Sequence, residues 1–235
     1  MRSAATTGSG RARLTVRGEE FVADASGALY WPREKLLAVA DLHFEKGSSF
    51  AARGVFLPPY DTRATLAALA RLVAAYRPRR VVALGDSFHD PHGAARLAAD
   101  DRASLAALQR GRDWLWIAGN HDPAPPAGLG GDAAQELLIG AVTFRHEPRP
   151  GAGEGEIAGH LHPAARVVGR GGSVRGRSFL SDGGRCVLPA FGAFAGGLNV
   201  RDAAFCALFG AAPAIAHVIG RAGVYAVPRL LCAPD

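Results

Sequence analysis

Two histidines stand one residue apart in the stretch GEIAGHLHPAARV, residues 155–167. In a β-strand, successive side chains point to opposite faces, so His160 and His162 would lie on the same face. The chain has only eight histidines, and two neutral imidazoles that converge on one point are typical of a metal site. We therefore expect this stretch to supply metal ligands.

Further short motifs carry side chains of the same chemical kind. Each follows an apolar run, and they are Asp41-Leu42-His43, Gly85-Asp86, Gly119-Asn120-His121-Asp122 and the single His146. Any one of them has an ordinary explanation, because Gly-Asp is common in turns and Asn-His-Asp could cap a helix. The whole set, in this order and at the ends of apolar runs, indicates that carboxylates, imidazoles and an amide meet at one metal site.

Alternating strands and helices are predicted around these motifs in the first half of the chain. The apolar runs at residues 36–41, 81–86 and 114–122 read as buried strands that end in polar residues. Between them, apolar residues at helical spacing predict a helix that Asp61 or Thr62 caps, and a second helix over residues 94–110. This order implies a parallel sheet that collects ligand groups at its carboxyl edge.

The second half of the chain changes character. From Glu136 onward, short β-like runs separated by glycines predict a second, mixed or antiparallel sheet, and the residues from Leu14 predict a hairpin. The fold class is therefore α/β (α+β). We expect a flexible N-terminal tail over residues 1–11 and a single domain over residues 12–235.

Composition limits the class of protein without deciding its function. With 235 residues and 49% hydrophobic content the chain can bury a core. It lacks an apolar run long enough for a membrane span and an apolar signal core, so we expect a cytoplasmic protein. The spacing of Cys186, Cys206 and Cys232 suggests reduced thiols. A net charge of +6 fits a phosphate-rich partner, but the arginine-biased composition makes charge alone indecisive.

Together, the five motifs resemble the calcineurin-like metallophosphoesterase superfamily, whose pattern is DxH, GD, GNH followed by an acid, a single His, and GHxH. The resemblance covers residues 36–162 directly. It implies a sandwich of two mixed β-sheets flanked by helices, with a dinuclear metal centre. By motif position, one metal would be held by Asp41, His43, Asp86 and His162, and the other by Asp86, Asn120, His146 and His160. Asp86 would bridge the two.

The chemistry of this ligand set points to hydrolysis. Mixed carboxylate, imidazole and amide ligands suit borderline ions such as Mn²⁺, Fe or Zn²⁺, whereas a thiolate site would need cysteines that these motifs lack. Two cations roughly 3.5–4 Å apart lower the pKa of a bridging water and neutralise charge on phosphoryl oxygens. His121 remains outside the ligand set, so we predict that it protonates the leaving oxygen and that Asp122 orients it.

Three longer stretches narrow the resemblance. EKGSSFAARGVFLPPYDT, LGDSFHD and PAFGAFAGGLN make the chain similar, over roughly residues 30–205, to the bacterial ligase-associated DNA damage response endonucleases. That similarity implies a manganese-dependent phosphodiesterase that cleaves DNA, single-stranded or flapped, in DNA repair beside a DNA ligase and a helicase.

The motifs alone indicate phosphoester hydrolysis and do not identify the substrate, so we also consider other functions. One is a small-molecule phosphatase or cyclic nucleotide phosphodiesterase. Another is a non-catalytic protein-binding scaffold, which should have lost several metal ligands, whereas all seven are present here.

Candidate substrate contacts flank the motifs. Lys46 and Arg53 could bind phosphate, and Phe56 or Tyr60 could stack on a base, although we expect Phe50, Phe56 and Leu57 to pack onto the domain. His89 could contact substrate or lie in a solvated loop. Arg166 opens an arginine-rich stretch that reads either as a mobile basic loop beside the metals or as a solvated hairpin. We expect His217 to be a packed strand residue.

Overall fold

The computed structural model describes residues 10–235 except residues 125, 127, 152–153 and 211, and it contains two β-sheets in that part of the chain. The first sheet has seven described strands in the order of the sequence. They are β1 (Arg11–Val16), β2 (Glu19–Asp24), β3 (Leu29–Trp31), β4 (Leu36–Val39), β5 (Arg80–Leu84), β6 (Asp113–Ile117) and β7 (Asp132–Ala134). The expected hairpin is β1–β2. Residues 1–9 of the predicted tail lie outside the described residues.

The second sheet contains nine strands among the described residues, and it is mixed as predicted. They are β8 (Glu136–Ile139), β9 (Val142–Arg145), β10 (Glu156–Ala158), β11 (Pro163–Gly169), β12 (Gly172–Ser181), β13 (Arg185–Val187), β14 (Leu198–Asn199), β15 (Ile215–Gly220) and β16 (Gly223–Pro228). β10 runs parallel to both β9 and β13, whereas β12 is antiparallel to β11, β13 and β15.

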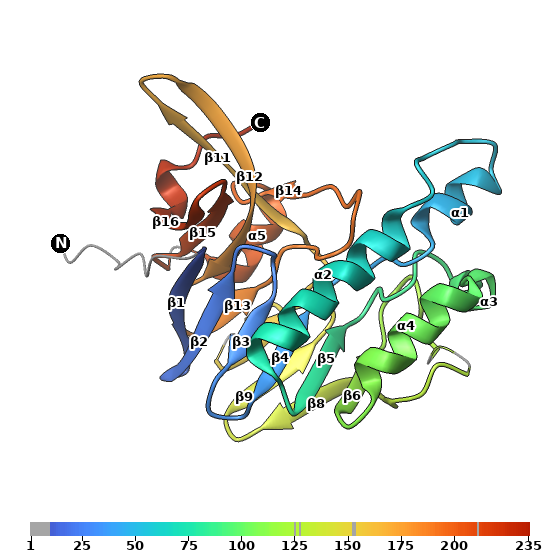
Figure 1. Cartoon of the computed structure of the whole chain (residues 1–235). Coiled ribbons are helices and arrows are strands. Elements are labelled where there is room, and N and C mark those ends of the chain that lie inside the picture. Colours follow the sequence, from blue (N-terminus) through green and yellow to red (C-terminus); the bar gives the residue numbers. More distant parts are fainter. Residues whose placement is uncertain (1–9, 125, 127, 152–153, 211) are drawn as a thin grey trace.

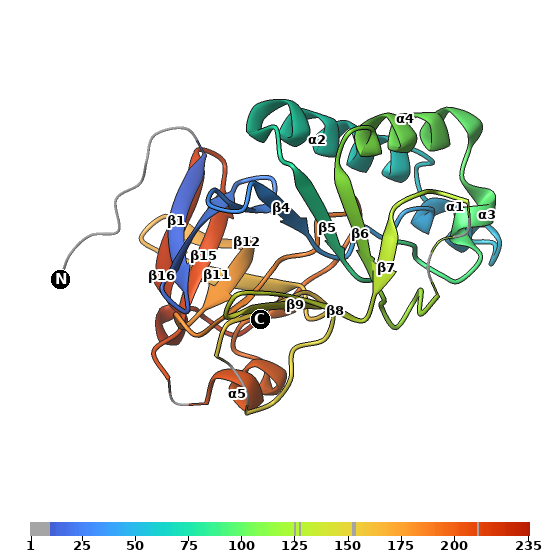
Figure 2. The same ribbon diagram turned by 90° about the horizontal axis from the view of Figure 1, so that it is seen from below.

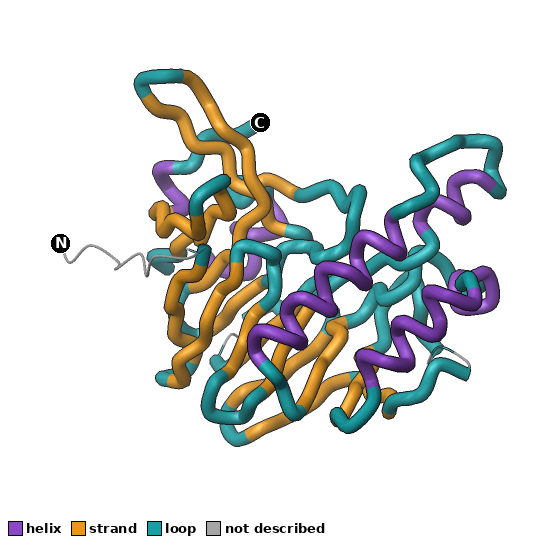
Figure 3. Tube along the Cα trace, in the orientation of Figure 1, coloured by secondary structure: helices purple, strands orange, loops and turns teal. Residues whose placement is uncertain are grey.

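Helices cover the outer faces of the two sheets (Figures 1 and 3). They are α1 (Lys46–Ala51), α2 (Asp61–Tyr76), α3 (Gly93–Arg96), α4 (Ala99–Gln109), α5 (Ala203–Phe209) and the 3-10 helix η1 (Arg229–Leu231). The single helix expected over residues 94–110 is broken, because Leu97 turns inward and is buried while Leu97 and Ala98 take extended backbone angles. Asp61 and Thr62 lie inside α2, which begins after Tyr60, so neither caps it.

The core is layered, as Figure 2 shows, with α2 and α4 on one side and α5 on the other. One face of β5 sends Val82 and Leu84 into the core between the sheets, where they meet β-strand residues such as Phe144 of the second sheet. Its other face sends Val81 and Ala83 against α2 and α4. This burial on both faces explains why the strand reads as a continuous apolar run.

The structure also bears on two features of the composition, the apolar segments and the cysteines. Among the described residues, no helix combines the length and hydropathy that a bilayer crossing requires. Cys186 and Cys232 are buried thiols, Cys206 is an exposed one, and all three are free.

Candidate metal centre

The predicted ligands come together where strands of both sheets end. Asp41, Asp86 and Asn120 follow β4, β5 and β6, which are parallel neighbours, so the carboxyl ends of these strands meet at one edge. His146 directly follows β9, and the GHLH stretch directly follows β10, its parallel partner in the second sheet. The sandwich therefore brings ligands from both sheets to the same place.

Among the described residues, two groups of side chains could each hold a metal ion. The first is Asp41, His43 and His162, and the second is Asp86, His146 and His160; within each group the candidate ligand atoms lie within 4.8 Å of one another. Asn120 joins the second group, since its Oδ1 lies 2.9 Å from His146 Nε2. These groups separate the histidines as the motif pattern does, while Asp86, which that pattern assigns to both metals, falls in the second group.

Asp86 belongs to the second group and also interacts with residues of the first. Its carboxylate favours the charged forms of both His160 and His162, one from each group. Its Oδ1 is 3.4 Å from His146 Nε2, and its backbone carbonyl accepts from the N–H of His43 at 2.9 Å. The residue therefore touches both halves of the site.

The ligands leave their strands through strained backbone turns. Five candidate ligands have positive φ angles, which are uncommon outside glycine: Asp41 (54°), His43 (44°), Asp86 (45°), His160 (69°) and His162 (46°). Such strain persists where surrounding structure over-determines it, and it concentrates at functional sites. The expectation that His160 and His162 alternate within a strand is wrong, because β10 ends at Ala158 and the left-handed turns after it send the two rings to different groups.

Close approach explains the glycines in two of the motifs. A Cβ on Gly119 would lie 2.2 Å from both the backbone nitrogen and Oδ1 of Asp86. A Cβ on Gly159 would lie 2.7 Å from Asp41 Oδ2. Both distances are far below any real carbon contact, so only glycine lets these loops reach the carboxylates.

Convergent nitrogen and oxygen atoms show that the donor set fits a divalent cation. The Leu84 carbonyl accepts from His146 Nδ1 at 2.9 Å, so the free lone pair of the His146 ring is on Nε2. That atom lies 2.9 Å from Asn120 Oδ1 and 3.1 Å from His160 Nδ1, so three potential ligand atoms meet at one point. His43 Nδ1 is buried and, within the described part of the chain, has no hydrogen-bond partner.

The protonation states also suit metal binding. Burial lowers the pKa of His43 to about 3, so its imidazole is neutral at pH 7 and can donate a lone pair. Burial opposes ionisation of Asp41, yet the hydrogen bond to His162 and the surrounding imidazoles hold its pKa below its ordinary value. A neutral imidazole beside an ionised carboxylate is the state that first-row divalent ions bind.

His121 belongs to neither group and faces them. Its Nδ1 donates to the His89 carbonyl at 2.9 Å, and its backbone N–H donates to Asp86 Oδ1 at 2.9 Å. Its Nε2 lies 3.9 Å from Asp86 Oδ2, and 42% of the side chain is exposed. The ring can therefore meet a bound phosphoryl group from the solvent side.

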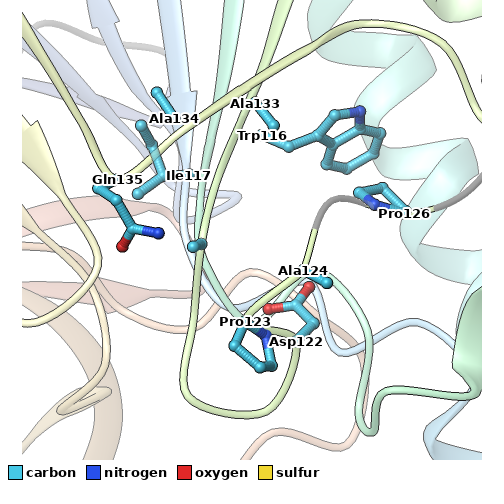
Figure 4. A pocket seen from close by; sticks show the side chains of 10 residues that line it. Trp116, Ile117, Asp122, Pro123, Ala124, Pro126, Ala133, Ala134 and Gln135 are labelled. Carbon is cyan, nitrogen blue, oxygen red and sulfur yellow. The ribbon is translucent and has the colours of Figure 1, made fainter.

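Asp122 does not have the orienting role that the sequence predicts. Its Oδ2 accepts from the Phe88 N–H at 3.0 Å, and burial raises the pKa of this carboxyl to about 6. The carboxylate lines a cavity of about 300 Å³ together with Trp116 and Pro123 (Figure 4). The backbone carbonyl of His89 orients His121 instead.

An ion pair fixes the loop that carries this carbonyl. Arg96 binds both oxygens of Asp90, at 3.0 and 2.5 Å, and its Nε donates to Ser48 Oγ at 2.9 Å. The hydrogen bonds from Arg96 hold the pKa of Asp90 well below its ordinary range. The loop after β5 is thus fastened to α3 and α1.

Three of the four candidate substrate contacts gather on one side of the site. His89 stacks on His121 with ring centroids 5.4 Å apart. Burial lowers the pKa of His89, and the nearby charges of Lys46 and Arg53 lower it further. Lys46 also donates to the Phe194 carbonyl at 3.0 Å. Lys46 and Arg53, which lie beside the neutral His89 ring, therefore form a positively charged flank beside His121.

Arg166 lies elsewhere. Its Nη1 donates to the Pro234 carbonyl at 3.3 Å, beside the C-terminus. The arginine-rich stretch forms the β11–β12 hairpin, and Arg175 in that hairpin binds Asp235. The second of the two interpretations, a hairpin, is therefore confirmed. His217 is buried in β15, as predicted.

Comparison with known proteins adds a family and a structural relative. The family model of calcineurin-like phosphoesterases matches residues 34–196. The crystal structure of the Pseudomonas putida nuclease MPE superposes with a TM-score of 0.70 at 30% sequence identity, covering 92% of this chain and 100% of that one. No curated protein matches the chain.

Proposed function

The chain belongs to the calcineurin-like phosphoesterases and is a hydrolase of phosphoesters, and on that premise we propose that it is a dinuclear metal-dependent phosphodiesterase acting on DNA. The observation that carries the proposal is the pair of adjacent ligand groups, with Asp86 in one group and hydrogen-bonded through its backbone to His43 of the other. One strained turn after β10 supplies a histidine to each group, which is what a two-ion site requires.

The residues around the centre divide the work of hydrolysis. The two ligand groups would hold two divalent cations, which would supply a hydroxide nucleophile at neutral pH and neutralise charge on the phosphoryl oxygens. His121, in its imidazolium form with a proton on each ring nitrogen, presents Nε2–H to the phosphoryl group and gives that proton to the leaving oxygen, which leaves a neutral ring. The His89 carbonyl keeps the ring in that orientation through Nδ1. Lys46 and Arg53 bind a neighbouring phosphate of the DNA strand.

Several observations favour DNA as the substrate. The chain carries a net charge of +6, its charged flank lies beside His121, and the structural relative is a nuclease. Manganese is the metal we favour from the family resemblance, and the donor set also suits iron and zinc. A cytoplasmic location, a role in DNA repair, and docking to a DNA ligase and helicase belong to the same proposal and rest on the family resemblance.

Salt dependence tests this assignment against a small-molecule phosphatase or cyclic nucleotide phosphodiesterase. If Lys46 and Arg53 each neutralise one phosphate of a single strand, the slope of log affinity against log salt is about −1.4. The KM for an oligonucleotide then rises about sevenfold between 50 and 200 mM salt, and about 2.6-fold in Lys46→Ala. Hydrolysis of a small aryl diester alone, at a rate insensitive to salt, would contradict DNA as the substrate.

A further inference from the structure

The loop between α1 and α2 exposes large hydrophobic side chains, and the expectation that Phe56 packs onto the domain is wrong. Phe56 is 85% exposed, Tyr60 64% and Val55 50%. Figure 1 shows this loop projecting from the body at the upper right. Exposed aromatic rings gathered within six residues are a binding feature rather than a scatter of surface residues.

The loop is fastened at both ends. At its start, the Val55 N–H donates to the Phe50 carbonyl at 3.0 Å. At its far end, Asp61 of α2 accepts from the Gly47 N–H at 3.0 Å, which ties α2 back to α1. The rings therefore occupy a defined place relative to α1.

That place is beside the charged flank of the metal centre. The Phe50 ring packs against His89 with centroids 5.4 Å apart, and His89 stacks on His121. Arg53 stands between Phe50 and Phe56 in the chain, and its charge acts on His89. Within the described residues Arg53 forms no ion pair, so its charge is available to a ligand. In the chain that follows α1, the charge of Arg53 is succeeded by the exposed ring of Phe56.

We propose that Phe56 is a base-stacking residue that receives an unpaired nucleobase next to the scissile phosphate. The inference rests on the proposed function and adds which residue recognises the strand. Alternating positive charge and an exposed ring match the alternating phosphates and bases of a single strand. A duplex hides its base faces, so Phe56 makes the enzyme prefer unpaired DNA. The charge of Lys46 and Arg53 favours this occupant over a protein partner.

Binding and cleavage of a labelled oligonucleotide test the proposal. Phe56→Ala should weaken binding of a 12-residue single strand about tenfold by fluorescence anisotropy, in the range expected for one stacked base. Its KM for cleavage should rise by the same factor, while hydrolysis of a small aryl diester stays unchanged. Phe56→Trp should keep wild-type binding, and Phe56→Leu, which retains apolar area without a ring, should bind as weakly as Phe56→Ala.

A matched control separates stacking from surface hydrophobicity. Leu230 is 76% exposed in η1, next to β16 on the opposite side of the molecule from α1 (Figure 1), so Leu230→Ala should bind DNA normally. Unchanged DNA binding by Phe56→Ala, or full binding by Phe56→Leu, would overturn the proposal. A wild-type enzyme that binds and cuts no oligonucleotide would instead overturn the proposed function.

Discussion

Removal of the His121 imidazole should slow DNA cleavage far more than hydrolysis of an activated ester. A general acid contributes about 10²- to 10⁴-fold, equivalent to roughly 3–5 kcal/mol of transition-state stabilisation. The deoxyribose oxygen is a poor leaving group that needs this proton, whereas a nitrophenolate leaves without it. His121→Ala should therefore lower kcat on DNA by about 10²-fold or more and on the aryl diester by less than about tenfold.

The structure predicts that this variant keeps its metals and its fold. His121 belongs to neither ligand group, 42% of its side chain is exposed, and alanine retains the backbone N–H that binds Asp86. Steady-state kinetics on both substrates, with metal content by atomic emission, measure the effect. His92→Ala, an exposed residue further along the loop that carries the His89 carbonyl, is the control and should match wild type. Equal losses on both substrates, or loss of bound metal, would refute the assignment of His121 as the acid.

Three further predictions follow from the same geometry. Gly119→Ala places a methyl group 2.2 Å from Asp86 Oδ1, so metal affinity measured by competition with a chelator should fall about 10- to 100-fold. In the control Gly169→Ala, no atom lies within 4 Å of the added carbon, so the metal affinity should equal that of wild type. Adding Mn²⁺ at about 100 times its Kd should stabilise the metal-stripped protein by about 2.7 kcal/mol per site and raise Tm by roughly 5–10 °C in calorimetry; no shift would contradict a built metal site. Burial lowers the pKa of His217 to about 4, so between pH 6.5 and about pH 4 the unfolded state binds this proton and the folded state does not. The free energy of unfolding should therefore fall by about 3 kcal/mol as the pH is lowered through that range. Urea unfolding of His217→Leu should lack this part of the pH dependence, and parallel profiles for the variant and wild type would contradict the prediction.

Much of the site could be predicted because the topology of a parallel sheet determines where its strands end. Apolar runs that end in Asp41, Asp86 and Asn120 read as parallel strands, and parallel strands bring their carboxyl ends to one edge. The family pattern then divided the ligands between two metals. The structure brings these side chains together in two groups, with Asp86 in the second group.

The remaining features depend on backbone geometry and tertiary context. Alternation failed for His160 and His162 because β10 stops before them, and a two-residue spacing cannot distinguish a strand from two left-handed turns. The backbone carbonyl of His89 orients His121. A pattern of side-chain types cannot predict which backbone carbonyl will accept a hydrogen bond. The exposure of Phe56 was missed because an apolar residue predicts burial, and only the fold shows that its loop lies outside the core.

Cleavage of a circular single-stranded DNA by the metal-stripped protein resupplied with Mn²⁺ tests the central claim most directly. We predict metal-dependent linearisation of the circle by wild type and none by Asp86→Asn, because Asp86 belongs to one ligand group and its charge acts on His162 of the other. An intact circle alongside hydrolysis of a small phosphodiester would contradict DNA as the substrate. Full activity of Asp86→Asn with normal metal content would contradict the shared carboxylate on which the dinuclear mechanism depends.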